Sequence, residues 1–241
     1  MTESTPNAPV AILTGAGSGI GREVARILSR EGYNLVLVAR RREPLEDTAR
    51  LCQSDMGTEC LVLPLDVGLP ASARAMVDAA LERFARLDAL ILNAGTAPLL
   101  PIDRHTPEII EDAFRTNALA PAYAIAAAWP VFSSRKSGRI VCTSTMGTDD
   151  PFPGFFAYAA AKSAVNSFVR SCEREGKRLN IRAFAVAPGA VETPMLRAIF
   201  SEQQIPAQKT LTPEAVARVI ADCALGRRDA DSGTTIFVPS P

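Results

Sequence analysis

The sequence predicts an α/β fold in which a doubly wound parallel sheet of about seven strands carries helices on both faces. Two observations predict it: short apolar runs alternate with longer amphipathic segments, and a glycine-rich segment separates the first run from the first amphipathic segment. Right-handed crossovers then place helices on both sides of the sheet. The chain has 241 residues, 47% of them hydrophobic, which suits one substantial core, so we expect a single catalytic domain over residues 10–241.

The expected strands are the short runs rich in apolar and β-branched residues. They cover residues 10–14, 35–39, 61–65, 89–92, 139–143, 182–187 and 235–238. The expected helices are the longer segments with apolar residues at helical spacing. They lie near residues 20–31, 43–55, 71–86, 107–132, 157–178 and 213–224. Residues 1–9 are polar and are expected to form a flexible arm, and the irregular residues 194–211 are expected to form a substrate lid.

The composition favours a small-molecule partner. Lys plus Arg and Asp plus Glu both number 26, so neither nucleic acid nor an anionic membrane is an evident partner. The absence of a signal-like start or a long apolar stretch predicts a soluble cytoplasmic protein. The five cysteines are scattered without a Cys-x-x-Cys pair, which suggests neither disulfides nor a metal site. The single histidine, His105, lies in a polar turn and is expected at the surface.

A glycine-rich motif follows the first expected strand. Residues 14–21 read Thr-Gly-Ala-Gly-Ser-Gly-Ile-Gly, so Gly15, Gly19 and Gly21 have the spacing Gly-x-x-x-Gly-x-Gly. Glycines between a strand and a helix let the backbone approach a pyrophosphate at the helix N-terminus. A tight turn without a ligand is the alternative. The motif predicts a Rossmann-type dinucleotide site to which Ser18 and Ile20 also belong.

A second motif places a phenol and an ammonium on one helix face. Tyr158 and Lys162 are four positions apart in an alanine-rich, helix-forming run. A cation beside a phenol favours the ionised form of the phenol. Alone, the pair would be an ordinary aromatic residue beside a solvated lysine. Together with the glycine motif, it indicates redox chemistry.

The two motifs resemble those of the classical short-chain dehydrogenase/reductase family, and the resemblance extends from about Val10 to Pro194. It implies an oxidoreductase that interconverts a carbonyl and a secondary alcohol with a nicotinamide cofactor. Tyr158 would be the general acid or base, and Lys162 would assist it and bind the nicotinamide ribose. The resemblance also implies a homodimer or homotetramer. The alternative is a cofactor-binding sensor or scaffold with the same fold and little turnover.

The resemblance implies further cofactor contacts at the ends of later strands. Asp66 and Val67 would contact the adenine side, although a single aspartate can equally cap a helix. The triplet Asn93, Ala94 and Gly95 would approach the cofactor, with Asn93 steadying the sheet; an ordinary turn is the alternative. The nicotinamide would be flanked by Pro188, Gly189, Val191 and Thr193.

The end of the second strand bears on the choice of cofactor. An acidic residue there would bind the ribose hydroxyls of NAD, but the position holds Ala39, followed by Arg40. A guanidinium offers a planar fork to a 2'-phosphate. The sequence therefore predicts NADP(H), unless this arginine and the two that follow it only solvate a loop.

Two hydroxyl residues compete for the role of polarising the substrate oxygen. The Ser-x-x-Gly pattern of the family selects Ser144, which we prefer. The usual interval of thirteen residues before the tyrosine selects Thr145 instead. Either hydroxyl can donate a hydrogen bond.

The fourth catalytic position implied by the resemblance is Asn117. Pro121, four residues later, has no N–H for the Asn117 carbonyl and predicts a kink that leaves this carbonyl free. The resemblance implies that the carbonyl holds a water that links Lys162 to solvent. The substrate pocket is expected to include Thr145, Met146, Phe155 and Ala190. The aromatic run 152–156 favours an apolar carbonyl or alcohol, unless its rings pack the lid or a subunit contact.

Overall fold

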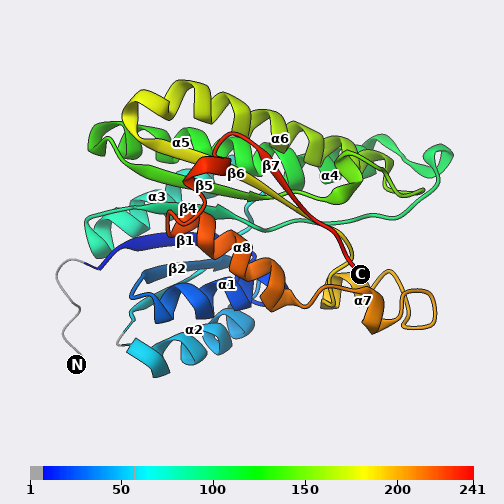
Figure 1. Ribbon diagram of the computed structural model, residues 1–241, viewed down its shortest axis with the longest axis horizontal. Coiled ribbons are helices and arrows are strands. Elements are labelled where there is room, and N and C mark those ends of the chain that lie inside the picture. The colour runs from blue at the N-terminus through cyan, green and yellow to red at the C-terminus, as the bar shows by residue number, and fades with distance from the viewer. Residues whose placement is uncertain (1–7, 57) are drawn as a thin grey trace.

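The computed structural model describes residues 8–56 and 58–241, so residues 1–7 of the expected arm lie outside the described residues. Seven strands form one parallel sheet in the order β3-β2-β1-β4-β5-β6-β7 (Figure 1). They are β1 (Val10–Thr14), β2 (Asn34–Ala39), β3 (Cys60–Pro64), β4 (Ala89–Leu92), β5 (Gly138–Thr143), β6 (Ile181–Pro188) and β7 (Thr235–Val238). The predicted fold class is confirmed.

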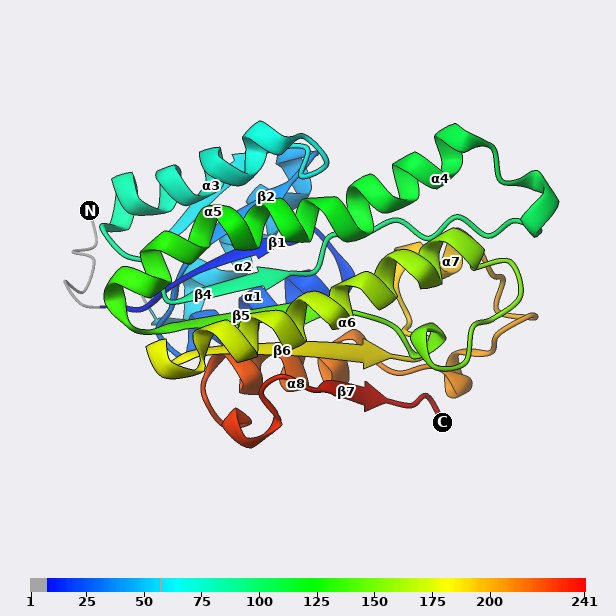
Figure 2. The same ribbon diagram turned by 90° about the horizontal axis from the view of Figure 1, so that it is seen from above.

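Helices cover both faces of the sheet (Figures 1 and 2). They are α1 (Gly19–Arg30), α2 (Arg42–Met56), α3 (Pro70–Phe84), α4 (Pro107–Phe114), α5 (Ala120–Arg135), α6 (Phe156–Gly176), α7 (Pro194–Arg197) and α8 (Pro213–Ala224). One apolar core joins the sheet to α1, α2 and α8, and the other joins it to α3, α5 and α6. None of the described helices is both long and apolar enough to cross a membrane.

Most of the apolar runs form strands whose side chains contribute to both cores, whereas β7 contributes to one core only. Along β1, Ala11 and Leu13 point into one core, and Val10 and Ile12 point into the other. Successive side chains of a strand alternate between faces, so a strand that is covered on both sides must be apolar throughout. All five residues of β1 and all four of β4 are buried accordingly.

The expected helix 107–132 is interrupted. It consists of α4, a π-helical turn over Arg115–Leu119, and α5, which continues to Arg135. Pro121 lies in the first turn of α5 and cannot donate the backbone hydrogen bond that a continuous helix requires at this point. The interruption is the distortion that the proline predicts, and Asn117 lies at its centre.

The strand order places a crevice at the carboxyl end of the sheet. From β1 the chain proceeds to β2 and β3 on one side, whereas β4 pairs with the other edge of β1. Such a reversal separates the loops that follow the two strands and creates a binding site between them. Here those loops are the glycine-rich segment and the segment that begins at Asn93.

Candidate active site

The glycine-rich segment is shaped by close backbone contacts. Gly15 and Gly19 adopt positive φ angles of 70° and 52°, a region that favours glycine. A Cβ on Gly21 would lie 2.2 Å from the Gly15 carbonyl oxygen, so no larger residue fits there. Ser18 is exposed, and within the described residues its side chain makes no capping bond to α1. The start of α1 also carries no acidic residue, so the segment can receive an anion.

Asn93 ties the ends of three strands together beneath this segment. Its Nδ2 donates to the carbonyl oxygens of Thr14 and Gly15, each at 3.4 Å. Its Oδ1 accepts a hydrogen bond from the Thr143 hydroxyl at 3.1 Å, and its backbone N–H donates to Thr14 Oγ1 at 3.0 Å. Ala94 N–H donates to the same hydroxyl at 3.1 Å. These bonds hold the loops after β1, β4 and β5 at one crevice.

Lys162 and Asn117 meet across Gly95. A Cβ on Gly95 would lie 2.8 Å from Asn117 Oδ1 and 3.5 Å from Lys162 Nζ. Asn117 is fully buried, and its Nδ2 donates to the carbonyl oxygens of Ala113 at 2.8 Å and Thr96 at 2.9 Å. Helix α6 places Tyr158 one turn before Lys162. The structure thus brings together three of the four predicted catalytic residues from α6 and the π turn.

The pKa of Tyr158 is raised, whereas the neighbouring lysine was expected to lower it. Burial raises the pKa of Tyr158 to about 12, and the side chain of Thr145 acts in the opposite direction. Lys162 is 3% exposed and donates to the Thr143 carbonyl at 2.7 Å, and burial lowers its own pKa to about 8. Desolvation is the largest cause of both pKa shifts. At neutral pH the phenol of Tyr158 holds its proton.

The structure places Thr145, rather than the preferred Ser144, against the phenol. The Ser144 N–H donates to the Val186 carbonyl at 2.7 Å, which extends the pairing of β5 with β6. Its Oγ is buried and, among the described residues, has no hydrogen-bond partner. Thr145 is half-buried, and its hydroxyl interacts with Tyr158. Because the strand alternation continues through Ser144, the next residue faces the site.

A brace from α6 holds Thr145. Asn166 Nδ2 donates to Thr148 Oγ1 at 3.0 Å, and this hydroxyl donates to the Thr145 carbonyl at 2.9 Å. Gly147 N–H donates to Thr145 Oγ1 at 3.3 Å. The sequence gives no sign of this brace, because it joins a loop to a helix position one turn beyond Lys162.

We expect Thr145→Val to lower kcat about 100-fold, as the loss of one donor to a developing oxyanion does. Ser144→Ala should lower kcat less than about 3-fold, because its hydroxyl has no hydrogen-bond partner among the described residues, and Thr145→Ser should keep most activity. The measurement is steady-state turnover of the three purified variants. Equal losses in Ser144→Ala and Thr145→Val would contradict this assignment.

The residues that were predicted to flank the nicotinamide lie at the end of β6 and directly after it. A Cβ on Gly19 would lie 3.0 Å from the Thr193 side chain, so the segment after β6 borders the glycine loop. Thr193 Oγ1 accepts the Leu196 N–H at 3.2 Å and caps α7. Pro188 ends β6, Gly189 N–H donates to the Val238 carbonyl at 3.0 Å, and the half-buried Ala190 and the buried Val191 follow.

The residues after β2 and β3 are accessible. Ala39 is half-buried, and Arg40 and Arg41 are exposed. Asp66 is exposed, and one of its carboxylate oxygens accepts the Gly68 N–H at 2.9 Å. Val67 is half-buried beside it, as is Ile20 at the start of α1. These side chains are thus accessible at the carboxyl end of the sheet.

The substrate side contains one residue that the sequence analysis missed. Phe200 follows α7 within the segment 194–211 and is 8% exposed. Its ring contacts Phe155, whose ring centroid lies 5.2 Å from that of Tyr158. Met146 is half-buried at the start of a short helical turn. A phenylalanine in an irregular segment has no motif, so only the fold reveals that it covers the site.

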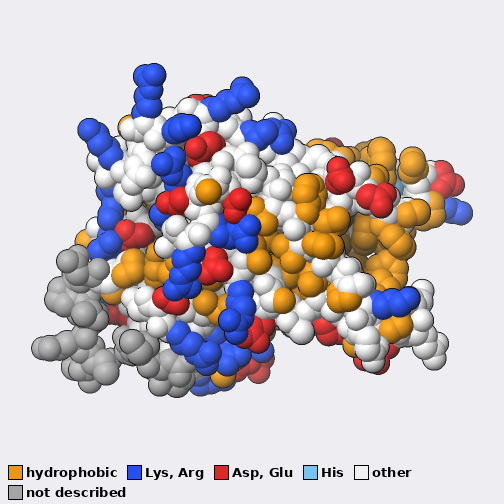
Figure 3. Space-filling view, viewed as in Figure 1, with side chains coloured by type: hydrophobic (Ala, Val, Ile, Leu, Met, Phe, Trp, Pro, Cys, Tyr) orange, Lys and Arg blue, Asp and Glu red, His pale blue; other side chains and the backbone are white. Residues whose placement is uncertain are grey.

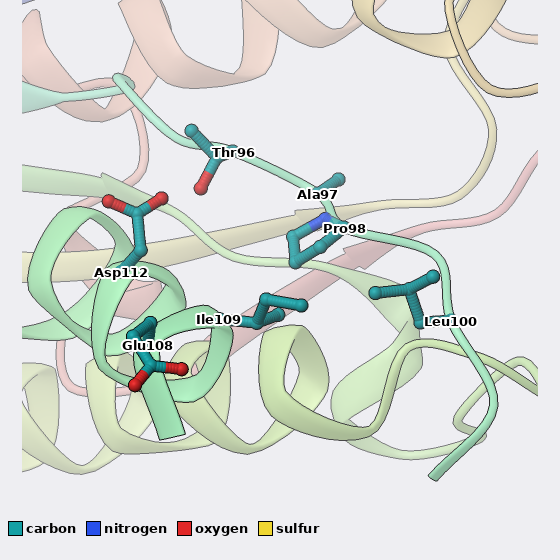
Figure 4. Close-up of a pocket in the computed structure, with 7 residues that line it drawn as sticks. All are labelled: Thr96, Ala97, Pro98, Leu100, Glu108, Ile109 and Asp112. Carbon is teal, nitrogen blue, oxygen red and sulfur yellow. The ribbon is translucent and has the colours of Figure 1, made fainter. Parts of the chain in front are cut away.

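A hollow of about 470 Å³ lies beside the site, on the α4 side of the loop after β4 (Figure 4). In Figure 4, Glu108, Ile109 and Asp112 of α4 face this loop. The lining also includes Thr96, whose backbone binds Asn117, but none of the predicted catalytic residues. The hollow is therefore distinct from the place where Tyr158 and Thr145 meet.

Comparisons with known proteins agree with this geometry. A family model described as short chain dehydrogenase matches residues 9–204. An uncharacterised oxidoreductase of Listeria monocytogenes is 32% identical over 220 residues, which cover 88% of each chain.

Solved structures are similar over nearly their whole length. A variant of actinorhodin polyketide ketoreductase with NADPH has a TM-score of 0.91 and 27% identity, with 98% of each chain covered. The 3-ketoacyl-(acyl-carrier-protein) reductase of Brucella melitensis, complexed with NADH, has a TM-score of 0.88 and 26% identity, with 95% of this chain and 96% of that chain covered.

Proposed function

Because the chain belongs to the short-chain dehydrogenase/reductase family, we propose that it reduces a ketone to a secondary alcohol with NADPH, with Tyr158 as the proton donor. Proteins of this family are oxidoreductases that act on carbonyl and alcohol groups with a nicotinamide cofactor. The observation that carries the proposal is the meeting of Tyr158, Lys162, Asn117 and the Thr145 hydroxyl beside the glycine-rich segment.

The residues present fit a dinucleotide. The glycine-rich segment is a cradle that Cβ atoms would fill, and α1 starts without a capping side chain or a carboxylate among the described residues. Gly15, Gly19 and Gly21 would hold the pyrophosphate, and Asp66 would bind on the adenine side. Val191 and Thr193 would orient the carboxamide of the nicotinamide. When bound, the cofactor supplies the hydride.

The protein's own groups handle the proton. Tyr158 holds its phenolic proton at neutral pH because burial raises its pKa to about 12, and it can donate this proton to the substrate oxygen. Thr145 donates a second hydrogen bond to that oxygen. Lys162 donates to the Thr143 carbonyl at 2.7 Å, and it would bind the nicotinamide ribose and stabilise the phenolate that remains. Asn117 would hold a water that returns a proton by way of Lys162, because Pro121 has no N–H to donate to the Asn117 carbonyl.

The preference for NADP(H) is the finer part of the proposal, since similar structures contain NADH or NADPH. It rests on Arg40, exposed at the end of β2, and on Ala39 where NAD enzymes need an acid. We expect Arg40→Ala to lower kcat/KM for NADPH about 10-fold or more and to leave NADH nearly unchanged, because a charge-assisted bond to the 2'-phosphate is lost.

Arg42→Ala is the matched control for Arg40→Ala. Arg42 lies two residues further on, at the start of α2, and pairs with Glu46 at 3.7 Å. Its removal should leave the cofactor ratio nearly unchanged. Wild-type protein that prefers NAD over NADP by about tenfold in kcat/KM would overturn the cofactor assignment.

The most direct experiment follows NADPH absorbance with a panel of carbonyl compounds. Oxidation of NADPH that depends on the carbonyl supports the proposal. Tight NADPH binding without oxidation by any compound would favour a sensor or scaffold instead. Size-exclusion chromatography of the same sample tests the homodimer or homotetramer that the family resemblance implies.

A further inference from the structure

Three segments border the site, and we call them the rim: residues 96–110, 145–158 and 190–211, which include the starts of α4 and α6 and all of α7. Of the eight large hydrophobic side chains that are exposed among the described residues, four lie on the rim. They are Ile102, Phe152, Phe156 and Met195. In Figure 3, hydrophobic side chains gather toward the end of the molecule where these loops lie. Such a concentration on one face indicates a binding surface.

Within the rim, aromatic rings connect the exposed Phe152 to the phenol of Tyr158. Phe152, 53% exposed, lies 5.9 Å from Phe155, which in turn lies 5.2 Å from Tyr158, measured between ring centroids. Phe200 covers both phenylalanines, with its ring nearly perpendicular to Phe152 at 5.7 Å and to Phe155 at 6.4 Å. These edge-to-face contacts are those that a further aromatic ring can join.

The charge of the rim selects against anions. Its three segments, all among the described residues, carry six carboxylates and only three cationic side chains. One of those cations, Arg197, is already paired with Glu192. Asp149 and Asp150 are exposed directly before the aromatic run. A substrate with phosphate or carboxylate groups would meet a net negative surface.

We propose that the substrate is an uncharged ketone that carries a flat apolar ring. The ring lies along Phe155 beneath Phe200, and the carbonyl oxygen reaches Tyr158 and Thr145. Ketones attached to coenzyme A or to an acidic carrier protein are poor substrates. This inference rests on the proposed function, with the same redox step, and specifies its substrate class.

Three β-keto compounds with the same reacting carbonyl test the inference. Ethyl acetoacetate is small and neutral, its γ-phenyl derivative adds a ring insulated from the carbonyl, and acetoacetyl-coenzyme A adds negative charge. We expect kcat/KM for the γ-phenyl derivative to exceed that for ethyl acetoacetate about 10-fold or more, because buried apolar groups discriminate on this scale. The kcat/KM for acetoacetyl-coenzyme A should be about 10-fold lower than that for the γ-phenyl derivative.

Substitutions of the rim phenylalanines test whether these residues cause the preference for a substrate with a ring. Phe200→Ala and Phe152→Ala should each lower the ratio of kcat/KM between the γ-phenyl derivative and ethyl acetoacetate at least about 3-fold. Phe237→Ala, an exposed phenylalanine on β7, is the control and should leave the ratio unchanged. Because Phe152 is half exposed, its variant is expected to fold even if Phe200→Ala does not.

A binding measurement provides a readout without turnover. Naphthol, which is neutral at pH 7, should raise the Tm of the protein saturated with NADP, whereas naphthoate, with the same ring and a negative charge, should not. The inference would be overturned if kcat/KM for acetoacetyl-coenzyme A equalled that for the γ-phenyl derivative, or if naphthoate bound as tightly as naphthol. Rim variants that alter the oligomeric state but leave the substrate ratio unchanged would also overturn it. Failure of all three ketones to oxidise NADPH or NADH would instead contradict the proposed function itself.

Discussion

Tyr158→Phe is expected to lower kcat about 100-fold or more and to leave cofactor binding intact. The phenyl ring keeps the packing against Phe155, whose centroid lies 5.2 Å away, so the site should retain its shape. Only the phenolic hydroxyl, with the proton that it donates, is removed. The measurement is steady-state kcat with a ketone, together with a fluorescence titration of NADPH on the same variant.

Tyr123→Phe is the matched control, because Tyr123 lies on α5 against the apolar core and outside the site. It should leave kcat within about 2-fold of the wild type. A Tyr158→Phe variant that retains more than about a tenth of the wild-type kcat would rule out the acid role of this residue, since such groups supply ~100-fold or more.

Lys162→Met is expected to lower kcat about 100-fold and yet to raise the free energy of unfolding at pH 7. The lysine is 3% exposed, and burial lowers its pKa from the usual 10.5 to about 8. A shift of this size corresponds to a destabilisation of about 3 kcal/mol while the ammonium is charged. Losing the hydrogen bond to the Thr143 carbonyl costs about 1 kcal/mol, so the net gain is about 2 kcal/mol.

The pH dependence distinguishes desolvation from a change in packing. Below about pH 8 the lysine is charged in both the folded and the unfolded states, and the folded state bears the full penalty. Between about 8 and 10.5 the unfolded chain binds the proton more strongly than the folded one, so wild-type stability from this group rises with pH. The advantage of Lys162→Met should therefore be largest at pH 6 to 7 and shrink toward pH 10.

Thermal unfolding of both proteins at pH 6 and 9.5 provides the test. A gain of about 2 kcal/mol corresponds to a rise in Tm of about 4 to 8 °C for a domain of this size. Lys177→Met, at an exposed lysine beyond α6, should show no pH-dependent difference. A Lys162→Met variant that is less stable than the wild type at pH 6 would show that the buried ammonium stabilises the fold.

Much of the fold was predictable because most of its strands are covered on both faces. The runs 10–14, 89–92 and 235–238 match β1, β4 and β7, and the other four strands differ from the prediction only at their ends. A parallel strand covered on both sides must be continuously apolar, which makes it visible in the sequence. The helix predicted over 107–132 was wrong in its continuity, although Pro121 had indicated a distortion there.

The candidate site was less predictable where it depends on the direction of a side chain. Ser144 and Thr145 are adjacent hydroxyl residues that a local pattern cannot separate. The continued pairing of β5 with β6 at Val186 buries the first and turns the second toward Tyr158. Phe200 became visible only when the segment after α7 folded against Phe155.

The sequence by itself determined the order of strands and helices, the glycine cradle and the spacing of Tyr158 and Lys162, because each of these depends on residues that are neighbours along the chain. Tertiary structure decided which hydroxyl faces the phenol, which rings line the mouth and how far burial moves the two pKa values. Those properties arise from contacts and desolvation between segments that are distant in sequence, and local spacing carries no record of them.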